Sequence, residues 1–172
     1  KTYAKFEAFE HPGGEDFKDY ESRLSFPIRD ISGKIVAFQG RHTGGDTPKY
    51  LFTPAGANLP LFPQVSPRQG DIILVEGIFD MLNLHDKGIQ NAVCCFGTNN
   101  INEDKLAILS MQGVSRITVF FDGDEAGQKA AINVKVMSEK IGFRVRNVEL
   151  ENLDPGALTE TQIRKLESKL YA

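Results

Sequence analysis

The chain has 172 residues, of which 41% are hydrophobic and 25% charged, and its net charge is −3. This size and composition indicate one globular domain, or one domain with a small appendage, which needs no disulfides to bury a core. No apolar run approaches the roughly 20 residues of a membrane span, and no signal peptide is visible, so we expect no membrane partner. Cys94 and Cys95 are adjacent within an apolar run, which predicts buried core thiols of a cytoplasmic protein rather than a disulfide or a zinc site.

The first seventy residues predict a small, mostly antiparallel β subdomain. The features expected in order are a loop at 11–14, a hairpin of strands 25–30 and 35–38, a loop at 42–48, a third strand at 50–52 and an irregular connection at 55–70. Between Arg23 and Lys49 there are five basic and two acidic residues, so this segment carries a local charge of +3. A locally basic segment suits contact with a polyanion.

From residue 71 onward the pattern alternates between strands and helices. We expect strands at 72–75, 92–96, 117–121 and 144–150, helices at 78–87 and 102–112, a helix that follows the loop 122–127 and ends at Lys140, and a last helix from Thr159 or Thr161 to about Leu170. Short β-branched and aromatic runs are typical of buried parallel strands. The fold class predicted is therefore α/β, with a doubly wound, mainly parallel four-stranded sheet and helices on both faces. The domains expected are 1–70, 71–158 and a C-terminal helix at 159–172.

Three acidic residues follow two of the apolar strands directly. Glu76 follows the run at 72–75, and Asp122 and Asp124 follow the run at 117–121. In an open parallel sheet, ligands bind beyond the carboxyl ends of the strands, so we expect these side chains to converge. Crowded carboxylates repel one another, and a hard divalent cation with oxygen ligands, Mg²⁺ or Mn²⁺, relieves the repulsion.

Two further acidic residues and one loop are candidates for the same site. Asp80 lies four residues after Glu76 near a helix start, and Asp154 follows the fourth strand. Gly97 and Thr98 follow the second strand and offer donors to phosphate. Each has an ordinary alternative: a first-turn acid, an Asp-Pro-Gly turn and a simple strand-to-helix loop. An EF-hand is excluded, because the acidic loop runs into a helix instead of ending on a Glu at its twelfth position.

Several motifs taken together resemble the Toprim domain of bacterial DnaG-like DNA primases. They are VEGIFD at 75–80, FGT at 96–98 and FDGDEAG at 121–127, preceded in the same order as in primases by FPIRD at 26–30, FQGR at 38–41 and DTPKYL at 46–51. The resemblance covers residues 23 to 158. It implies Mg²⁺-dependent synthesis of RNA primers from nucleoside triphosphates on a single-stranded DNA template. It also implies a replicative helicase as a partner, which would bind through primase regions that are missing from this sequence.

The resemblance also implies roles for particular residues. Glu76, Asp122 and Asp124 would hold the metal, and Asp80 and Asp154 would bind it directly or through water. The basic residues Arg29, Arg41 and Lys49 would contact the template or the incoming triphosphate. We assign Glu76, Asp80, Asp122 and Asp124 as catalytic.

Three departures from the primase pattern keep other functions open. Primases carry a second acid two residues after the position of Asp154, where this chain has Gly156. The zinc ribbon and most of the small basic subdomain are absent from the sequence, and only one helix follows the Toprim region, so we expect a fragment or a reduced primase of a mobile element. The alternatives are a Toprim nuclease and a non-catalytic nucleic-acid-binding module.

Overall fold

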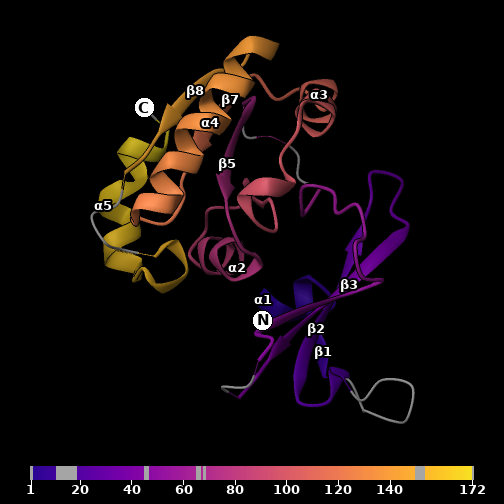
Figure 1. Cartoon of the computed structure of the whole chain (residues 1–172). Helices are drawn as coiled ribbons and strands as arrows, with labels where there is room; N and C mark the ends of the chain where they lie inside the picture. Colours follow the sequence, from indigo (N-terminus) through magenta and orange to yellow (C-terminus); the bar gives the residue numbers. More distant parts are fainter. Residues whose placement is uncertain are drawn as a thin grey trace. The chain divides into compact units, whose positions relative to one another are not determined.

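The computed structural model describes residues 2–10, 19–44, 47–64, 67, 69–149 and 154–171. The loop predicted at 11–14 lies outside these residues, as does part of the loop predicted at 42–48. The chain divides into two compact units, 1–60 and 61–172, which are described separately (Figure 1).

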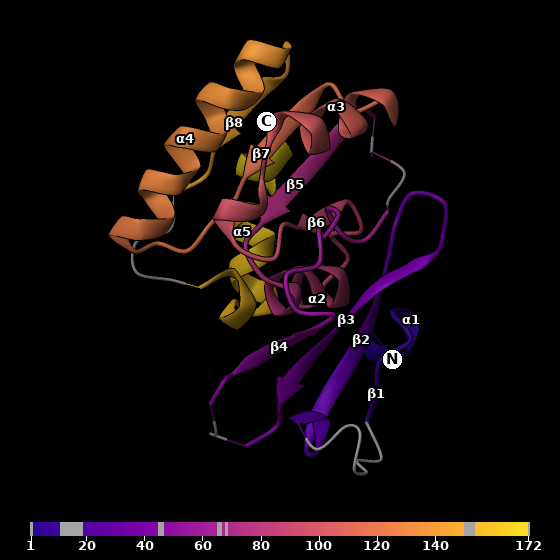
Figure 2. The ribbon, with the colours of Figure 1, turned by 45° about the vertical axis from the view of Figure 1, so that its right-hand side comes forward.

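The first unit is built on a four-stranded antiparallel sheet, in the order β1-β2-β3-β4 (Figure 2). Its elements are α1 (Thr2–Lys5), β1 (Phe9–Glu10), β2 (Arg23–Arg29), β3 (Ile35–His42) and β4 (Tyr50–Thr53). The hairpin and the third strand predicted from the sequence are confirmed as β2, β3 and β4. Gly33 has a φ of 82°, which a residue without Cβ adopts freely at the turn between β2 and β3.

The second unit contains a four-stranded parallel sheet, in the order β6-β5-β7-β8. Its elements are β5 (Asp71–Val75), α2 (Ile78–Asp86), β6 (Ala92–Cys94), η2 (Thr98–Asn100), α3 (Glu103–Met111), β7 (Arg116–Val119), α4 (Glu125–Ile141), β8 (Arg144–Asn147), η3 (Pro155–Ala157) and α5 (Glu160–Tyr171). The predicted α/β class with a parallel sheet is confirmed.

Alternation along the strands separates the two faces of this sheet. Ile72 and Leu74 of β5 belong to a core cluster that includes Leu106 of α3 and Val134 of α4. On the opposite face the Thr118 hydroxyl donates to the Leu170 carbonyl of α5 at 3.1 Å, and a ring nitrogen of His85 in α2 lies 2.9 Å from the Ala92 carbonyl oxygen. Helices therefore cover both faces, as the doubly wound pattern requires.

Local signals define where most helices begin and end. The Asn102 side chain accepts from Lys105 N at 3.0 Å and starts α3, and Gly142 adopts the left-handed conformation that ends α4. The strand expected at 92–96 stops at Cys94, because the chain turns at Phe96 with a φ of 56°. Both cysteines are free and buried. In the described part of the chain, we find no helix long and apolar enough to cross a membrane.

Candidate metal centre

Three aspartates of the second unit come together at the carboxyl ends of the parallel strands. Asp80, Asp122 and Asp154 each contribute a carboxylate oxygen, and these oxygens all lie within 4.8 Å of one another. Asp122 follows β7, Asp154 follows β8, and Asp80 lies in the first turn of the helix after β5. Parallel pairing of the strands brings together side chains that are 74 positions apart in the sequence.

Asp80 and Asp154 are held in place by hydrogen bonds from their own surroundings. Gly77 N donates to Asp80 Oδ2 at 2.7 Å, and Gly156 N donates to Asp154 Oδ1 at 2.6 Å. One turn beyond Asp80, the Asn83 side chain donates to the carbonyl oxygens of Pro155 at 2.8 Å and Leu158 at 3.0 Å. Helix α2 therefore fixes the η3 turn that carries Asp154.

Glu76 lies beside this cluster and contacts it through the backbone of Asp122. Its Oε1 accepts from Asp122 N at 3.3 Å. The first turn of α4 approaches both residues closely at Gly127. An added Cβ there would lie 2.4 Å from the Asp122 carbonyl oxygen and 3.0 Å from Glu76 Oε1. This close approach requires glycine at position 127.

Asp124, which the sequence analysis placed with the metal ligands, has a structural task in the protein. It is the N-cap of α4, and its Oδ1 accepts from Gly127 N at 2.7 Å. Its second carboxylate oxygen makes no hydrogen bond among those between described residues, and its side chain is exposed. The acidic trio with mutually close oxygens is thus Asp80, Asp122 and Asp154, with Glu76 and Asp124 around it.

Burial and mutual repulsion raise the proton affinity of the cluster. Burial raises the pKa of Asp80 to about 8, and the negative charges of Asp154 and Asp122 add to this rise. Burial also raises the pKa of Glu76, followed in size by repulsion from Asp122 and by smaller contributions from Asp124 and Asp154. Carboxylates with raised pKa values at one rim favour occupation by a positive ion.

Gly156 occupies the position at which the resemblance implied a further acid. A Cβ there would lie 2.7 Å from Asp80 Oδ1 and 3.0 Å from Asp154 Oδ1. Asp80 and Asp154 therefore approach the η3 backbone closely at this position. Any larger residue at position 156 requires one of these two carboxylates to move.

The donor set fits a hard divalent cation. All the groups that converge are carboxylates, without a cysteine or histidine ligand among the described residues of the cluster. Oxygen ligands of this kind suit Mg²⁺ and Mn²⁺, whereas zinc sites prefer nitrogen and sulfur.

Hydrogen bonds hold the loop after β6 against the backbone of Glu76. Gly97 N, which the sequence analysis offered to phosphate, donates to the Glu76 carbonyl oxygen at 3.0 Å, while Thr98 begins η2 and is partly exposed. The ammonium group of the buried Lys105 donates to the Asn100 carbonyl oxygen at 2.7 Å, and Asn100 Nδ2 donates to Cys95 O at 2.8 Å. These bonds shape the loop.

The three predicted basic residues belong to the first unit and differ in their surroundings. Arg29 forms a two-pronged ion pair with Glu7, at 2.9 and 3.1 Å, so its guanidinium is already engaged. The Arg41 guanidinium lies over the Tyr50 ring, 4.7 Å from its centroid, and Lys49 Nζ lies 5.7 Å from the same centroid. Arg41, Lys49 and Tyr50 form a basic and aromatic group, which suits phosphates and stacked bases.

Sequence reasoning missed two residues that build the site. Asn83 lies three positions after Asp80, hence on the same face of α2, and that spacing was the available signal. Gly127 stands at the end of the quoted acidic motif, but its close approach to Asp122 becomes visible only once the backbone is known.

Known proteins match both units. The Toprim-like family matches residues 73–159, and the family described as DNA primase catalytic core, N-terminal domain, matches residues 5–59. The DNA primase of Pseudomonas aeruginosa is 34% identical over 165 residues, covering 87% of this chain and 24% of that protein. The DNA primase of Synechocystis is 31% identical over 150 residues, covering 77% of this chain and 23% of that protein.

Solved structures agree with these matches. The Aquifex aeolicus primase, with its zinc binding and RNA polymerase domains, has a TM-score of 0.79 at 25% identity, covering 98% of this chain and 52% of that one. A DNA primase domain from Pseudomonas aeruginosa has a TM-score of 0.68 at 34% identity, covering 92% and 52%. The chain spans about a quarter of the length of the curated relatives it matches. It belongs to the Toprim-like family, as a DnaG-like primase Toprim domain preceded by a primase catalytic-core N-terminal domain.

Proposed function

We propose that the second unit carries a nucleotidyl-transfer site that depends on Mg²⁺ or Mn²⁺ and makes RNA primers on single-stranded DNA. The observation that carries this proposal is the convergence of Asp80, Asp122 and Asp154 at the carboxyl rim, next to Glu76. A module that only binds nucleic acid gains nothing from crowding acidic groups, because they repel phosphate.

The chain's own residues divide the work at this site. Asp122, Asp80 and Asp154 would hold the metal, Glu76 would contribute a further carboxylate, and Asp124 would keep the acidic loop in place by capping α4. When bound, the divalent ion would neutralise charge that develops on the reacting phosphate and orient the triphosphate.

Nucleic acid and nucleotide are the partners proposed for the first unit. The group formed by Arg41, Lys49 and Tyr50 offers positive charge beside an aromatic face. Arg29 would contribute only if its pair with Glu7 opened, so its proposed share in template binding is smaller.

A primer-synthesis assay on a single-stranded template tests this function. We expect synthesis to require Mg²⁺ or Mn²⁺ and to fall about 10²-fold or more in Asp122→Asn, because the substitution removes a charge at the point where phosphate charge develops. Asp104→Asn, an exposed change of the same charge in the first turn of α3, serves as the control. Normal synthesis by Asp122→Asn rejects the assignment. Plasmid nicking by the wild-type protein without synthesis favours a nuclease.

A further inference from the structure

Strand β8 is the open margin of the parallel sheet. It pairs with β7 on one side, and no strand among the described residues pairs with its outer side (Figure 1). The N–H groups of Arg144 and Val148 donate to carbonyl oxygens on the β7 side, at 3.0 and 2.9 Å. Because the backbone groups of a strand alternate in direction, the N–H groups of Val145 and Asn147 point away from β7. An edge of this kind is a template for a further strand.

A hollow of about 430 Å³, called here the β8 groove, follows this edge. Every residue of β8 lines it, together with Lys135 of α4 and with Leu170 and Tyr171 of α5. Since α4 and α5 cover opposite faces of the sheet, a hollow that touches both helices passes around the edge of β8. The β8 groove extends to Asp71 and Arg116 at the amino ends of β5 and β7, whereas the acidic cluster lies beyond the carboxyl ends. The two sites are therefore separate.

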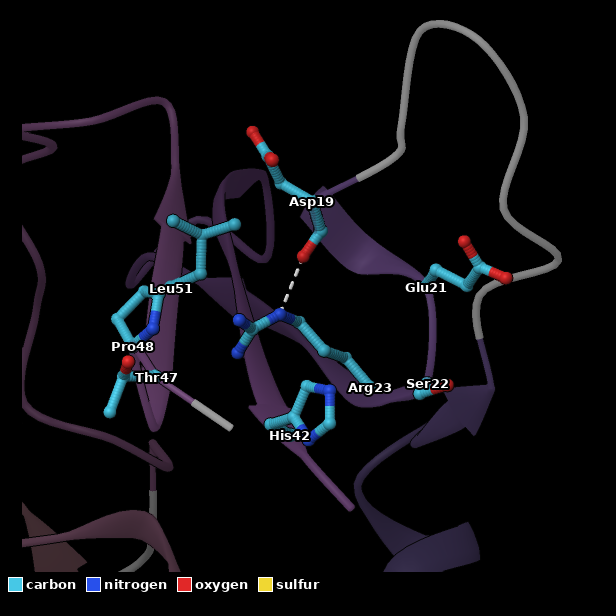
Figure 3. Close-up of a pocket in the computed structure, with 8 residues that line it drawn as sticks. All are labelled: Asp19, Glu21, Ser22, Arg23, His42, Thr47, Pro48 and Leu51. Carbon is cyan, nitrogen blue, oxygen red and sulfur yellow. Dashed lines mark hydrogen bonds between the residues drawn. The ribbon is translucent and has the colours of Figure 1, made fainter. Parts of the chain in front are cut away.

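The charge of the β8 groove favours an acidic partner. Among the described residues that line it, the basic ones are Arg116, Lys135, Arg144 and Arg146, and the acidic one is Asp71. Asp71 is already paired with Arg116, and the contact of Lys135 with Glu139, at 3.9 Å, joins two half-exposed groups and is weak. The pocket of the first unit differs, since Arg23 shares its walls with two acidic residues (Figure 3). Uncompensated positive charge is thus a property of the β8 groove.

The arginines of β8 oppose a second copy of this chain as the added strand. Arg144 and Arg146 are two positions apart and so lie on one face of the sheet, the face on which Arg146 Nη1 donates to the Lys169 carbonyl oxygen of α5 at 3.1 Å. Antiparallel pairing of β8 with itself about Val145 would place Arg144 opposite Arg146. Like charges directly opposite each other destabilise a strand pair, whereas an acidic residue in that position stabilises it.

The other face of β8 offers an apolar surface to the same partner. Val145 and Asn147 lie on this face, where Asn147 Nδ2 donates to Gln128 Oε1 of α4 at 3.2 Å. Ile132 and Val136 follow Gln128 at intervals of four residues, hence on the same stripe of α4. Their side chains are 60% and 48% exposed. A strand beside β8 would therefore meet positive charge on one face and apolar side chains on the other.

We propose that the β8 edge binds an extended segment of a partner protein, in which acidic and apolar residues alternate, as an additional strand of the sheet. Its backbone pairs with the outward groups of Val145 and Asn147, and its acidic side chains meet Arg144 and Arg146. Its apolar side chains face the exposed stripe of α4. A nucleic acid would use the positive charge alone and leave the backbone edge and the apolar stripe without a partner.

Nitrogen-15 NMR of the wild-type chain tests the proposal with a synthetic peptide of alternating glutamate and valine, blocked at both ends. Saturable shifts and slower solvent exchange are expected for the Val145 and Asn147 amides, because they become hydrogen-bonded. The matched control is the same peptide methylated at every backbone nitrogen, which keeps the charges but loses the donors, and it should not bind. Absence of these shifts, equal binding of the methylated peptide, or a response at β8 only to a single-stranded oligonucleotide overturns the proposal.

A charge variant gives a second, independent measurement. Arg144→Gln should weaken binding of the unmodified peptide about threefold, as expected for one cross-strand charge pair, and unchanged affinity counts against the site. Lys34→Gln, the same loss of charge on an exposed turn of the first unit, should leave the affinity unchanged. The titration contains no metal, nucleotide or template, so its outcome is separate from that of the primer-synthesis assay. Arg144→Gln should also leave primer synthesis unchanged, because Arg144 lies at the amino end of β8.

Discussion

Replacing Gly127 by alanine should destabilise the protein, although the same change stabilises most helices. Alanine is favoured over glycine within a helix by about 1 kcal/mol. Here the added Cβ would lie 2.4 Å from the Asp122 carbonyl oxygen, a backbone atom that cannot rotate away, and 3.0 Å from Glu76 Oε1. Overpacking costs about 1–3 kcal/mol, and a clash with backbone belongs at the upper end. The net loss expected is therefore about 2 kcal/mol.

Urea unfolding in EDTA measures this loss, with Ala126→Gly as the matched control. Ala126 is the exposed neighbour of Gly127 in α4, so its replacement should cost only the helix propensity, about 1 kcal/mol. The clash should also displace Glu76 or Asp122, and we expect Mn²⁺ affinity to fall about tenfold in Gly127→Ala, the equivalent of about 1.4 kcal/mol. A Gly127→Ala protein that is as stable as the wild type, with unchanged Mn²⁺ affinity, refutes the close approach.

Three other perturbations test the surroundings of the site. Without metal, the free energy of unfolding should fall as pH rises from about 4 toward about 8, because the folded protein keeps a proton on Asp80 that the unfolded chain releases above its ordinary pKa of 3.8. Urea titrations at several pH values measure this slope, and Asp80→Asn should remove up to about 1.4 kcal/mol per pH unit of it. An unchanged slope in Asp80→Asn contradicts the assignment. Asn83→Ala should lower Mn²⁺ affinity in calorimetry by releasing the turn that carries Asp154, and full affinity would show that this turn needs no anchor. Arg116→Gln should lower the urea midpoint of unfolding by leaving the buried Asp71 carboxylate without its two-pronged partner, and an unchanged midpoint would mark a surface pair.

The rim of the parallel sheet was predictable because two independent patterns agree there. Short apolar runs predicted parallel strands, and the acidic residues Glu76, Asp122 and Asp124 follow two of these runs directly. Parallel topology then requires the strand ends to share an edge. The sequence predicted that Glu76, Asp122 and Asp124 converge, but of these three only Asp122 belongs to the trio with mutually close oxygens, which it forms with Asp80 and Asp154. The roles of the individual carboxylates remain a proposal.

The finer arrangement depends on backbone geometry that local sequence does not encode. An acid in the loop after β7 can either face an ion or cap the following helix, and the hydrogen bond from Gly127 N to Asp124 shows the second use. The tight approach at Gly156 likewise depends on where η3 meets α2. Such contacts join segments that are far apart in the chain, so no periodicity signals them.

The first unit shows the same limit for charged residues. Arg29 was expected at a nucleic-acid surface because it is basic and lies in the predicted hairpin, but its partner Glu7 lies 22 positions earlier, in a segment without a clear pattern. Arg23 gave no signal beyond its charge, and its burial follows from the register that places it opposite His42. Long-range pairing decides which cations are available to a ligand.

Paramagnetic broadening by Mn²⁺ tests most directly whether the carboxylates at the sheet rim hold a divalent ion. At substoichiometric Mn²⁺, the amide signals of Gly77, Gly123 and Gly156 should broaden first, because the first two are adjacent to Glu76 and Asp122 and the third donates to Asp154. Asp122→Asn should abolish this selective broadening, whereas Asp104→Asn should preserve it. Broadening that begins elsewhere, or that is unchanged in Asp122→Asn, would contradict the metal centre.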